Sequence, residues 1–242
     1  MLLAIDVGNT QIKGAVFEQD TLLYKEIISF SDWKNSLNTI LKNFPKIKNL
    51  IISSVGKLTE KDFLEFNSLL TVVFITRQSR FPFKNLYASP ETLGIDRMIL
   101  ASGAVLQFPM VNRLVIDAGT CVTYDFIDAN NNYLGGAISP GIRLRYESLH
   151  NYTEKLPLLM REIPKQMVGN STEQSIHSGV INGLIMEIEG FINFNLNRND
   201  NFIIILTGGD AEFLAVRLKN TIFANSNFLL ESLNRTFQYQ QQ

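Results

Sequence analysis

The chain opens with Met1-Leu-Leu-Ala-Ile-Asp6-Val-Gly8-Asn9-Thr10-Gln-Ile-Lys13-Gly-Ala-Val-Phe17, in which an apolar run stops at a carboxylate, turns through Gly-Asn-Thr and resumes as an alternating strand. This pattern predicts a β-hairpin whose tight turn carries Asp, Asn, Thr and Lys together. Such a turn offers backbone N–H groups, a hydroxyl and an ammonium to a phosphate, and a carboxylate to its metal ion. An ordinary edge hairpin would have the same local pattern, so this stretch needs support from elsewhere in the chain.

The same order of residue types returns in the middle of the chain, at Leu114-Val-Ile-Asp117-Ala-Gly119-Thr120. The two aspartates are 117 − 6 = 111 positions apart, close to half of the 242 residues. Both copies continue as alternating strands, over residues 11–17 and 121–127, and a further strand follows each, over 21–29 and 133–138. The repeat predicts two similar lobes, residues 1–110 and 111–242, each opening with a three-stranded meander.

Composition places the chain among soluble globular proteins, with 45% hydrophobic and 19% charged residues. The formal net charge of −1 gives no overall field that would attract nucleic acid or an anionic membrane. Cys121 is the single cysteine, so an intrachain disulfide is excluded. The apolar start lacks the basic residues of a signal peptide, and no run reaches the ~18 apolar residues of a membrane span. We expect a cytoplasmic protein.

Between the repeats, helical and strand patterns alternate. The first half predicts a helix over 33–44, a buried strand over 49–55, a helix from 59 to 70 with Thr59 and Asp62 at its start, and a strand over 71–75. The second half predicts helices over 143–152, 180–196, 211–218 and 225–242, and a buried strand over 202–206. Meanders followed by alternating helices and strands indicate an α/β fold built on mixed sheets.

Two further turns carry groups suited to a phosphate or another anion. Gly94-Ile-Asp96-Arg97 leads into an apolar helix over 98–106, where free backbone N–H groups and the helix dipole favour an anion. An ordinary acidic first turn with an exposed arginine is the alternative. Thr207-Gly-Gly-Asp210 follows the buried strand at 202–206, as nucleotide-side turns do in α/β folds. His150 and His177 are isolated, so the sequence predicts no transition-metal site.

The ordered set of motifs resembles the type III pantothenate kinases over nearly the whole chain. The residues that carry the resemblance are Asp6 to Lys13, Tyr87, Gly94 to Arg97, Asp117 to Thr120, Gly135-Gly136 with Pro140-Gly141, Thr172 with Ser178-Gly179, and Thr207 to Asp210. That family belongs to the superfamily of acetate kinase, sugar kinases, actin and heat-shock ATPases. The resemblance implies two duplicated actin-like (ribonuclease H-like) lobes that enclose a nucleotide cleft.

The resemblance also implies a reaction: ATP phosphorylates the primary hydroxyl of pantothenate to give 4'-phosphopantothenate, the first step of coenzyme A biosynthesis. It assigns ATP binding to Asp6, Val7, Gly8, Asn9, Thr10, Gln11, Ile12, Lys13 and Thr120. Asp6 would hold Mg²⁺ through water, and Asp117 would bind a monovalent cation, K⁺ or NH₄⁺. These assignments agree with the preference of such cations for oxygen ligands.

On the substrate side, the resemblance makes Asp96 the base that takes the proton of the pantothenate hydroxyl. The implied pantothenate contacts are Tyr87, Gly94, Ile95, Asp96, Arg97 and Thr172. Members of the family are homodimers whose sites include residues of both subunits, and the helix that carries Gly179 and Gly183 is a candidate interface. No nucleic acid or membrane partner is implied.

Two departures from the family pattern touch no motif residue. Cys121 stands where the family commonly has alanine, and the loops around Phe81 and Leu156-Pro157 are short. Two other functions stay open at this point. One is a kinase of another small alcohol or sugar, against which only the substrate-side residues argue. The other is a non-catalytic regulatory relative, against which the intact Asp6, Asp96 and Asp117 argue.

Overall fold

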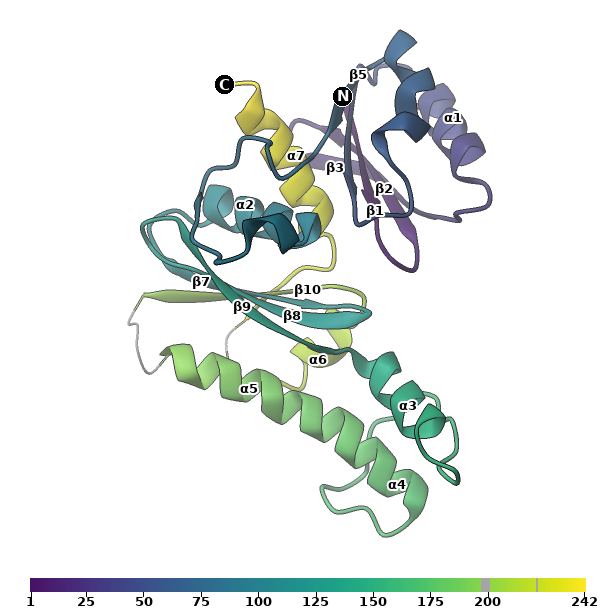
Figure 1. Ribbon diagram of the computed structural model, residues 1–242, viewed down its shortest axis with the longest axis vertical. Helices are drawn as coiled ribbons and strands as arrows, with labels where there is room; N and C mark the ends of the chain where they lie inside the picture. Colours follow the sequence, from purple (N-terminus) through teal and green to yellow (C-terminus); the bar gives the residue numbers. More distant parts are fainter. Residues whose placement is uncertain (197–200, 221) are drawn as a thin grey trace. The chain divides into compact units, whose positions relative to one another are not determined.

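The computed structural model of the chain describes residues 1–196, 201–220 and 222–242 (Figure 1). Its contacts divide the chain into two compact units. Unit 1 comprises Met1–Pro109, Asn131–Tyr133 and Asn227–Gln242, and unit 2 comprises Met110–Asn130 and Leu134–Ser226. Each unit is built on its own mixed sheet.

The sheet of unit 1 contains β1 (Leu2–Val7), β2 (Ile12–Glu18), β3 (Thr21–Ile28), β4 (Asn49–Ser54) and β5 (Thr71–Phe74), in the order β3-β2-β1-β4-β5. The first three strands form an antiparallel meander, and β4 and β5 continue the sheet in parallel. The strand β1 is buried along its whole length, as expected for a central strand. The meander predicted from the opening stretch is confirmed.

Helices cover both faces of this sheet. On one face, α1 (Trp33–Asn43) and the 3₁₀-helix η1 (Glu60–Ser68) pack an aromatic cluster against the strands, with the rings of Trp33 and Phe63 4.8 Å apart. The other face carries α2 (Ile95–Gln107) and α7 (Phe228–Gln240), which contact each other and β4. The predicted cap of η1 is confirmed, since the Thr59 N–H donates to Asp62 Oδ2 at 2.7 Å.

The C-terminal helix packs in unit 1, which corrects the expected division of the chain at that end. The break after Pro109 lies at the expected boundary, but residues 227–242 do not join the second half. The reason is the buried face of α7: Thr236 and Ser102 of α2 share a hydrogen bond of 2.7 Å, and Asn234 Nδ2 donates to the Gln19 carbonyl at 2.8 Å. An amphipathic pattern shows which face of a helix is buried but not what buries it.

The helices α2 and α7 approach so closely that only glycine fits at position 103. A Cβ on Gly103 would lie 1.8 Å from Ser232 Oγ and 2.9 Å from the Ser232 Cα, so the helices would have to separate. We expect Gly103→Ala to lower the free energy of unfolding by about 1–3 kcal/mol, measured by urea denaturation. Asn38→Ala is the control: it places an alanine at an exposed position of α1, so it should be neutral or stabilising. Equal stability of the two variants would contradict this packing.

The second sheet repeats the strand order of the first. It contains β7 (Asn112–Ala118), β8 (Cys121–Ile127), β9 (Asn132–Pro140), β10 (Phe202–Thr207) and β11 (Phe223–Ala224), ordered β11-β10-β7-β8-β9. The two-residue strand β6 (Lys84–Asn85) pairs with the first two residues of β9, which belong to unit 1. β8 is antiparallel to β7, and β10 is parallel to it, as β2 and β4 are to β1. The predicted α/β class with a meander opening each sheet is confirmed.

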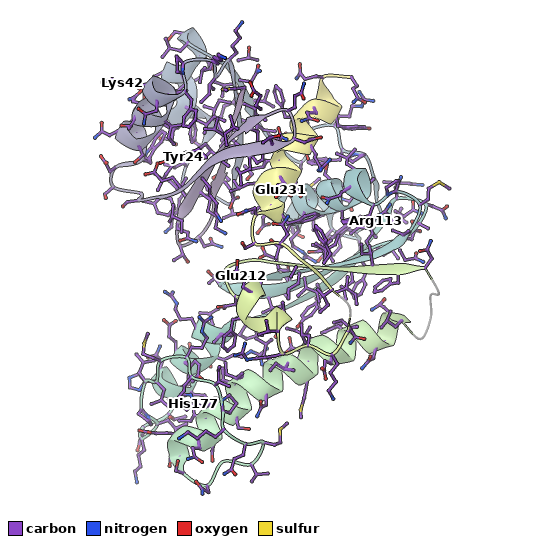
Figure 2. All side chains as sticks on the ribbon, turned by 180° about the vertical axis from the view of Figure 1, so that it is seen from behind. Tyr24, Lys42, Arg113, His177, Glu212 and Glu231 are labelled. Atoms are coloured by element: carbon purple, nitrogen blue, oxygen red, sulfur yellow. The ribbon has the colours of Figure 1, made fainter. Side chains whose placement is uncertain are left out.

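One face of the second sheet packs on α3 (Ile142–Asn151), α4 (Thr172–His177), a π-helical turn (Ser178–Asn182), α5 (Gly183–Leu196) and α6 (Ala211–Ala215). The helix predicted over 180–196 starts earlier, at Thr172, and α6 stops three residues before the predicted end at 218. Figure 2 labels His177 on α4 and Arg113 on β7. Arg113 is fully buried and donates to the Asp128 carbonyl at 2.7 Å. Within the described part of the chain, no helix has the length and apolar character needed to cross a membrane.

Candidate functional site

Asp6 lies at the end of β1, between a lysine and a serine on the neighbouring strands. It pairs with Lys13 on β2 and with Ser53 on β4. Ser53 Oγ donates to Asp6 Oδ1 at 2.8 Å, and the Asp6 side chain is only 5% exposed. Burial raises the pKa of Asp6 to about 6 and the charge of Asp96 adds to this, whereas the Ser53 hydrogen bond and the Lys13 charge oppose it. The site therefore holds a carboxylate that a bound cation would stabilise.

The turn that follows Asp6 is tight at its base and exposed at its tip. The Gly8 N–H donates to the Gln11 carbonyl at 3.1 Å, which closes the turn. A Cβ on Gly8 would lie 3.1 Å from that same carbonyl oxygen. Asn9 and Thr10 are exposed, so the tip is accessible to a ligand. With Lys13 on the strand that leaves the turn, this geometry suits a phosphate group.

Asp96 and Arg97 occupy the first turn of α2, as predicted, with Gly94 as the N-cap. The Arg97 N–H donates to Asp96 Oδ1 at 2.9 Å and fixes the carboxylate at the helix end. A Cβ on Gly94 would lie 2.4 Å from Asp96 Oδ1, so a side chain at position 94 would displace that carboxylate. Because the Asp96 charge raises the pKa of Asp6, the two carboxylates of unit 1 interact electrostatically.

Tyr87 and Arg97 lie together in unit 1. The Arg97 guanidinium carbon is 5.8 Å from the centre of the Tyr87 ring, and the Arg97 side chain is 5% exposed. Tyr87 is held by its N–H, which donates to Asn85 Oδ1 at 2.9 Å, and by an edge contact with the ring of Tyr133. A cavity of about 250 Å³ lies in the same part of unit 1, lined by Arg77, Gln78, Asn85, Pro90, Glu91 and Met98. A buried guanidinium beside an aromatic ring suits an anionic organic substrate.

Asp117 occupies in unit 2 the position that Asp6 occupies in unit 1. It lies near the end of β7, where it pairs with Thr123 on β8 and with Thr207 on β10. The following turn is closed by the Gly119 N–H, which donates to the Cys121 carbonyl at 2.9 Å. Thr120 at its tip is exposed, and its carbonyl accepts from the Gly141 N–H at 3.0 Å. Carboxylate and hydroxyl oxygens come together here, the ligand chemistry of a hard cation.

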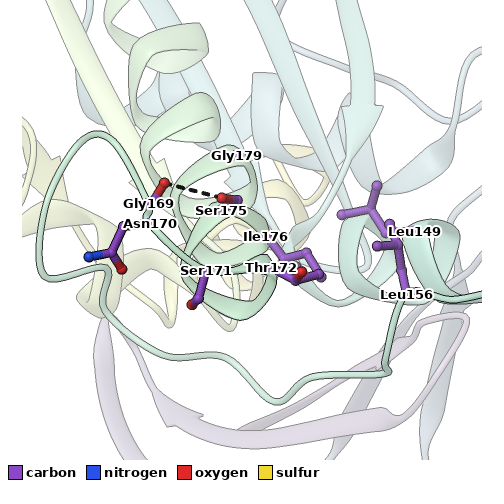
Figure 3. Close-up of a pocket in the computed structure, with 9 residues that line it drawn as sticks. All are labelled: Leu149, Leu156, Gly169, Asn170, Ser171, Thr172, Ser175, Ile176 and Gly179. Atoms are coloured by element: carbon purple, nitrogen blue, oxygen red, sulfur yellow. Dashed lines mark hydrogen bonds between the residues drawn. The ribbon is translucent and has the colours of Figure 1, made fainter.

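Thr172 lines a separate cavity of unit 2 (Figure 3). The cavity has a volume of about 760 Å³ and is lined by Leu149, Leu156, Gly169, Asn170, Ser171, Thr172, Ser175, Ile176 and Gly179. Thr172 is the first residue of α4 and is exposed, while the cap is Ser171, whose Oγ accepts from the Gln174 N–H at 3.3 Å. In the hydrogen bond drawn in Figure 3, Ser175 Oγ donates to the Gly169 carbonyl at 3.4 Å. This bond joins two residues that line the cavity.

The predicted site residues thus divide between the two units. Unit 1 holds Asp6 to Lys13, Tyr87 and Gly94 to Arg97, and unit 2 holds Asp117, Thr120 and Thr172. Sequence reasoning did not select Ser53, and it placed Thr207 in a nucleotide-side turn without linking it to Asp117. The structure adds the pairings of Ser53 with Asp6 and of Thr207 with Asp117. Only the strand register reveals them. The described residues contain no group of three or more His, Cys, Asp or Glu side chains that could hold a metal ion.

Comparisons with known proteins point in one direction. The family model of type III pantothenate kinases matches residues 2–193. The chain is 61% identical to a type III pantothenate kinase of Flavobacterium johnsoniae, over 99% of this chain and 98% of that protein. It is 60% identical to a type III pantothenate kinase of Flavobacterium psychrophilum, over 99% of this chain and 100% of that protein.

Solved structures support the fold. A Campylobacter jejuni protein described as a candidate Baf family transcriptional activator superposes with a TM-score of 0.64 at 20% identity, covering 98% of each chain. A Listeria monocytogenes protein described as a candidate N-acetylmannosamine kinase gives a TM-score of 0.57 at 13% identity, covering 100% of this chain and 99% of the other. At these identities the likeness concerns the fold alone.

Proposed function

The chain belongs to the type III pantothenate kinase family, and on that basis we propose that it transfers the γ-phosphoryl group of ATP to the primary hydroxyl of pantothenate. The product is 4'-phosphopantothenate, and the reaction is the first step of coenzyme A biosynthesis. The observation that carries the proposal is the 61% identity over 99% of the chain to a pantothenate kinase. We place the reaction in the cytoplasm.

Asp96 is the proposed base. Its carboxylate sits in the first turn of α2, oriented by the Arg97 N–H, and is half-buried, so it can accept the proton of a hydroxyl group that approaches the helix end. In a loose phosphoryl-transfer transition state the hydroxyl proton leaves late, so an ordinary carboxylate suffices. Its main work is to orient the attacking oxygen. Gly94 leaves the space that this carboxylate needs.

The turn from Gly8 to Lys13 is the proposed phosphate loop, and Thr120 is the proposed second nucleotide contact. The exposed residues Asn9 and Thr10 at the tip of the first turn, followed by the Lys13 ammonium, supply donors and positive charge for phosphate oxygens. Asp6 and Asp117 are the proposed cation-holding residues, Asp6 for Mg²⁺ through water and Asp117 for K⁺ or NH₄⁺. When bound, these cations neutralise charge on the transferring phosphate.

Tyr87, Gly94, Ile95, Arg97 and Thr172 are the proposed pantothenate contacts. The buried Arg97 guanidinium against the Tyr87 ring supports recognition of the negatively charged acid. Thr172 lines a cavity of about 760 Å³. This position supports a substrate role, because small organic molecules such as pantothenate bind in concave sites.

The test is ADP release by the purified chain with Mg²⁺, K⁺ and one acceptor at a time. We expect pantothenate to stimulate ADP release at least about a hundredfold over the acceptor-free rate, whereas glucose and N-acetylmannosamine leave that rate unchanged. Stimulation by a sugar but not by pantothenate would assign the chain to another acceptor. No stimulation by any acceptor would remove the proposed activity.

We further propose a homodimer formed through the helix that runs from α4 into α5. The supporting feature is an exposed stripe of Gly179, Gly183, Met186 and Gly190 at helical spacing, with Met186 55% exposed and nothing within 4 Å of the three glycines. Small residues let a second helix approach closely. Met186→Glu should therefore convert a dimer into a monomer in analytical ultracentrifugation, while Leu158→Glu, at an exposed apolar residue outside the stripe, should not. A dimer that survives Met186→Glu would move the interface elsewhere.

A further inference from the structure

The duplicated sheets place a hydroxyl beside each of the two central aspartates. In the first sheet Ser53 on β4 pairs with Asp6, and in the second sheet Thr207 on β10 pairs with Asp117. Paired residues of parallel strands point to the same side of a sheet. Thr207 and Asp117 therefore share the face opposite to the core that Leu206 and Ile116 help to build.

The two hydroxyls differ in what they bind. Ser53 Oγ donates to its aspartate at 2.8 Å, whereas Thr207 Oγ1 is buried without a hydrogen-bond partner among the described residues. Thr207 is only 1% exposed. A buried hydroxyl without a partner costs free energy, and valine has the same shape without that cost. The unpartnered hydroxyl next to Asp117 thus indicates a bound ligand that would interact with Thr207 Oγ1.

The two aspartates also differ in whether a positively charged side chain lies on the neighbouring strand. On the other side of Asp6 the strand β2 presents Lys13, a fixed ammonium. On the corresponding side of Asp117 the strand β8 presents Thr123, which has a hydroxyl and no charge. The Thr123 hydroxyl itself donates to Asp125 Oδ2 at 3.3 Å, and Asp125 is fully buried. The row Thr207, Asp117, Thr123 therefore supplies oxygen atoms and no ammonium, a donor set that selects a hard cation over a soft one.

The chain after Thr207 closes tightly on the same carboxylate. Gly208 has a φ of +97°, and a Cβ there would lie 2.5 Å from Asp117 Oδ1 and 2.4 Å from the Ala118 carbonyl oxygen. The Asp210 N–H donates to that carbonyl at 2.9 Å and locks the turn in place. Residues 207 and 208 are thereby held against Asp117, so that the Thr207 hydroxyl and the Asp117 carboxylate can bind the same small ion.

We propose that Thr207 Oγ1 is a second oxygen ligand of the monovalent cation that Asp117 binds. The hydroxyl offers its lone pairs to the cation, as the Asp117 carboxylate offers its charge. This inference rests on the proposed cation site at Asp117 and extends it to the turn Thr207-Gly-Gly-Asp210, which connects the cation to the strand β10.

The experiment follows thermal unfolding of the full chain while KCl replaces choline chloride at constant total chloride, with and without a non-hydrolysable ATP analogue. Wild type should melt at higher temperature as K⁺ rises, and Asp117→Asn should lose that shift. Thr207→Val should raise the K⁺ concentration for the half-maximal shift by about tenfold or more. In choline chloride alone it should melt no lower than wild type, because only an unpartnered hydroxyl is removed. Thr207→Ser keeps the hydroxyl and should stay close to wild type.

The outcomes separate the inference from the proposed function. An unchanged K⁺ midpoint in Thr207→Val overturns the inference, even if that variant is less stable than wild type, because a lost buried water would explain the lower stability. A Thr207→Ser variant whose K⁺ midpoint shifts as in Thr207→Val also overturns it. The K⁺ shift of Asp117→Asn then still tests the cation site at Asp117, and pantothenate-dependent ADP release still tests the kinase activity. A wild-type chain without any K⁺ shift in either arm overturns both the inference and the proposed cation site, but not the kinase activity.

Discussion

Asp96→Asn is expected to lower the pantothenate-dependent turnover of the chain by about a hundredfold or more, because an amide cannot accept the hydroxyl proton. The substitution preserves shape, and the amide oxygen can still accept the Arg97 N–H that fixes Asp96 at 2.9 Å. Folding and ATP affinity should therefore stay as in wild type. Steady-state kinetics, thermal unfolding and calorimetric ATP binding measure the three quantities separately.

The control for Asp96→Asn is Glu60→Gln, which neutralises an exposed acidic residue at the start of η1. It changes the net charge by the same amount and should leave turnover unchanged. If Asp96→Asn retained more than about a tenth of the wild-type turnover, Asp96 would not be the base. If it lost ATP binding as well, its role would lie in holding the nucleotide.

Asp6→Asn should have opposite effects on activity and on stability. With Mg²⁺-ATP, turnover should fall by about a hundredfold or more, because the carboxylate proposed to hold the hydrated cation is lost. Without nucleotide or divalent cation, the same variant should be more stable than wild type at neutral pH. Burial raises the pKa of Asp6 from 3.8 to about 6, so ionising Asp6 is unfavourable in the folded chain.

The sign of the pH dependence follows from that raised pKa. A carboxyl group whose pKa is higher in the folded state contributes its stability below the unfolded value of 3.8 and loses it as pH rises through about 6. The free energy of unfolding of Asp6→Asn should therefore match wild type near pH 4 and exceed it by on the order of 2–3 kcal/mol above pH 7. Urea titrations across this range in EDTA measure the difference.

Glu18→Gln is the matched control for the stability measurement, because Glu18 is an exposed carboxylate at the end of β2. Its free energy of unfolding should follow that of wild type at every pH. A neutral-pH stability of Asp6→Asn equal to or below that of wild type would mean that Asp6 is compensated in the folded chain. The free carboxylate would then not be poised for a cation.

The opening stretch predicts so much of the fold because its polar residues lie where an apolar strand must turn. A carboxylate and a glycine after a buried run fix the hairpin between β1 and β2, and the copy at Asp117 predicts a second sheet of the same kind. The first turn of α2 is equally local, since Gly94 caps a continuous apolar helix. These features depend on residues near one another in the chain, so the sequence suffices to predict them.

The features that sequence reasoning missed depend on residues far apart. Ser53 lies in a buried strand, and only the parallel register of β4 brings its hydroxyl to Asp6. The close packing of α7 on α2 depends on Gly103, whose missing Cβ leaves room for Ser232. Register and close packing follow from tertiary contacts that no local pattern encodes.

The most direct test of the central claim is identification of the product. Incubation of the purified chain with ATP, Mg²⁺, K⁺ and pantothenate, followed by mass spectrometry and ³¹P NMR, should reveal pantothenate carrying one phosphate monoester on its primary hydroxyl, in equal amount to the ADP formed. The same incubation with Asp96→Asn should yield little of it. Consumption of ATP without phosphorylated pantothenate, or no consumption at all, would contradict the proposed activity.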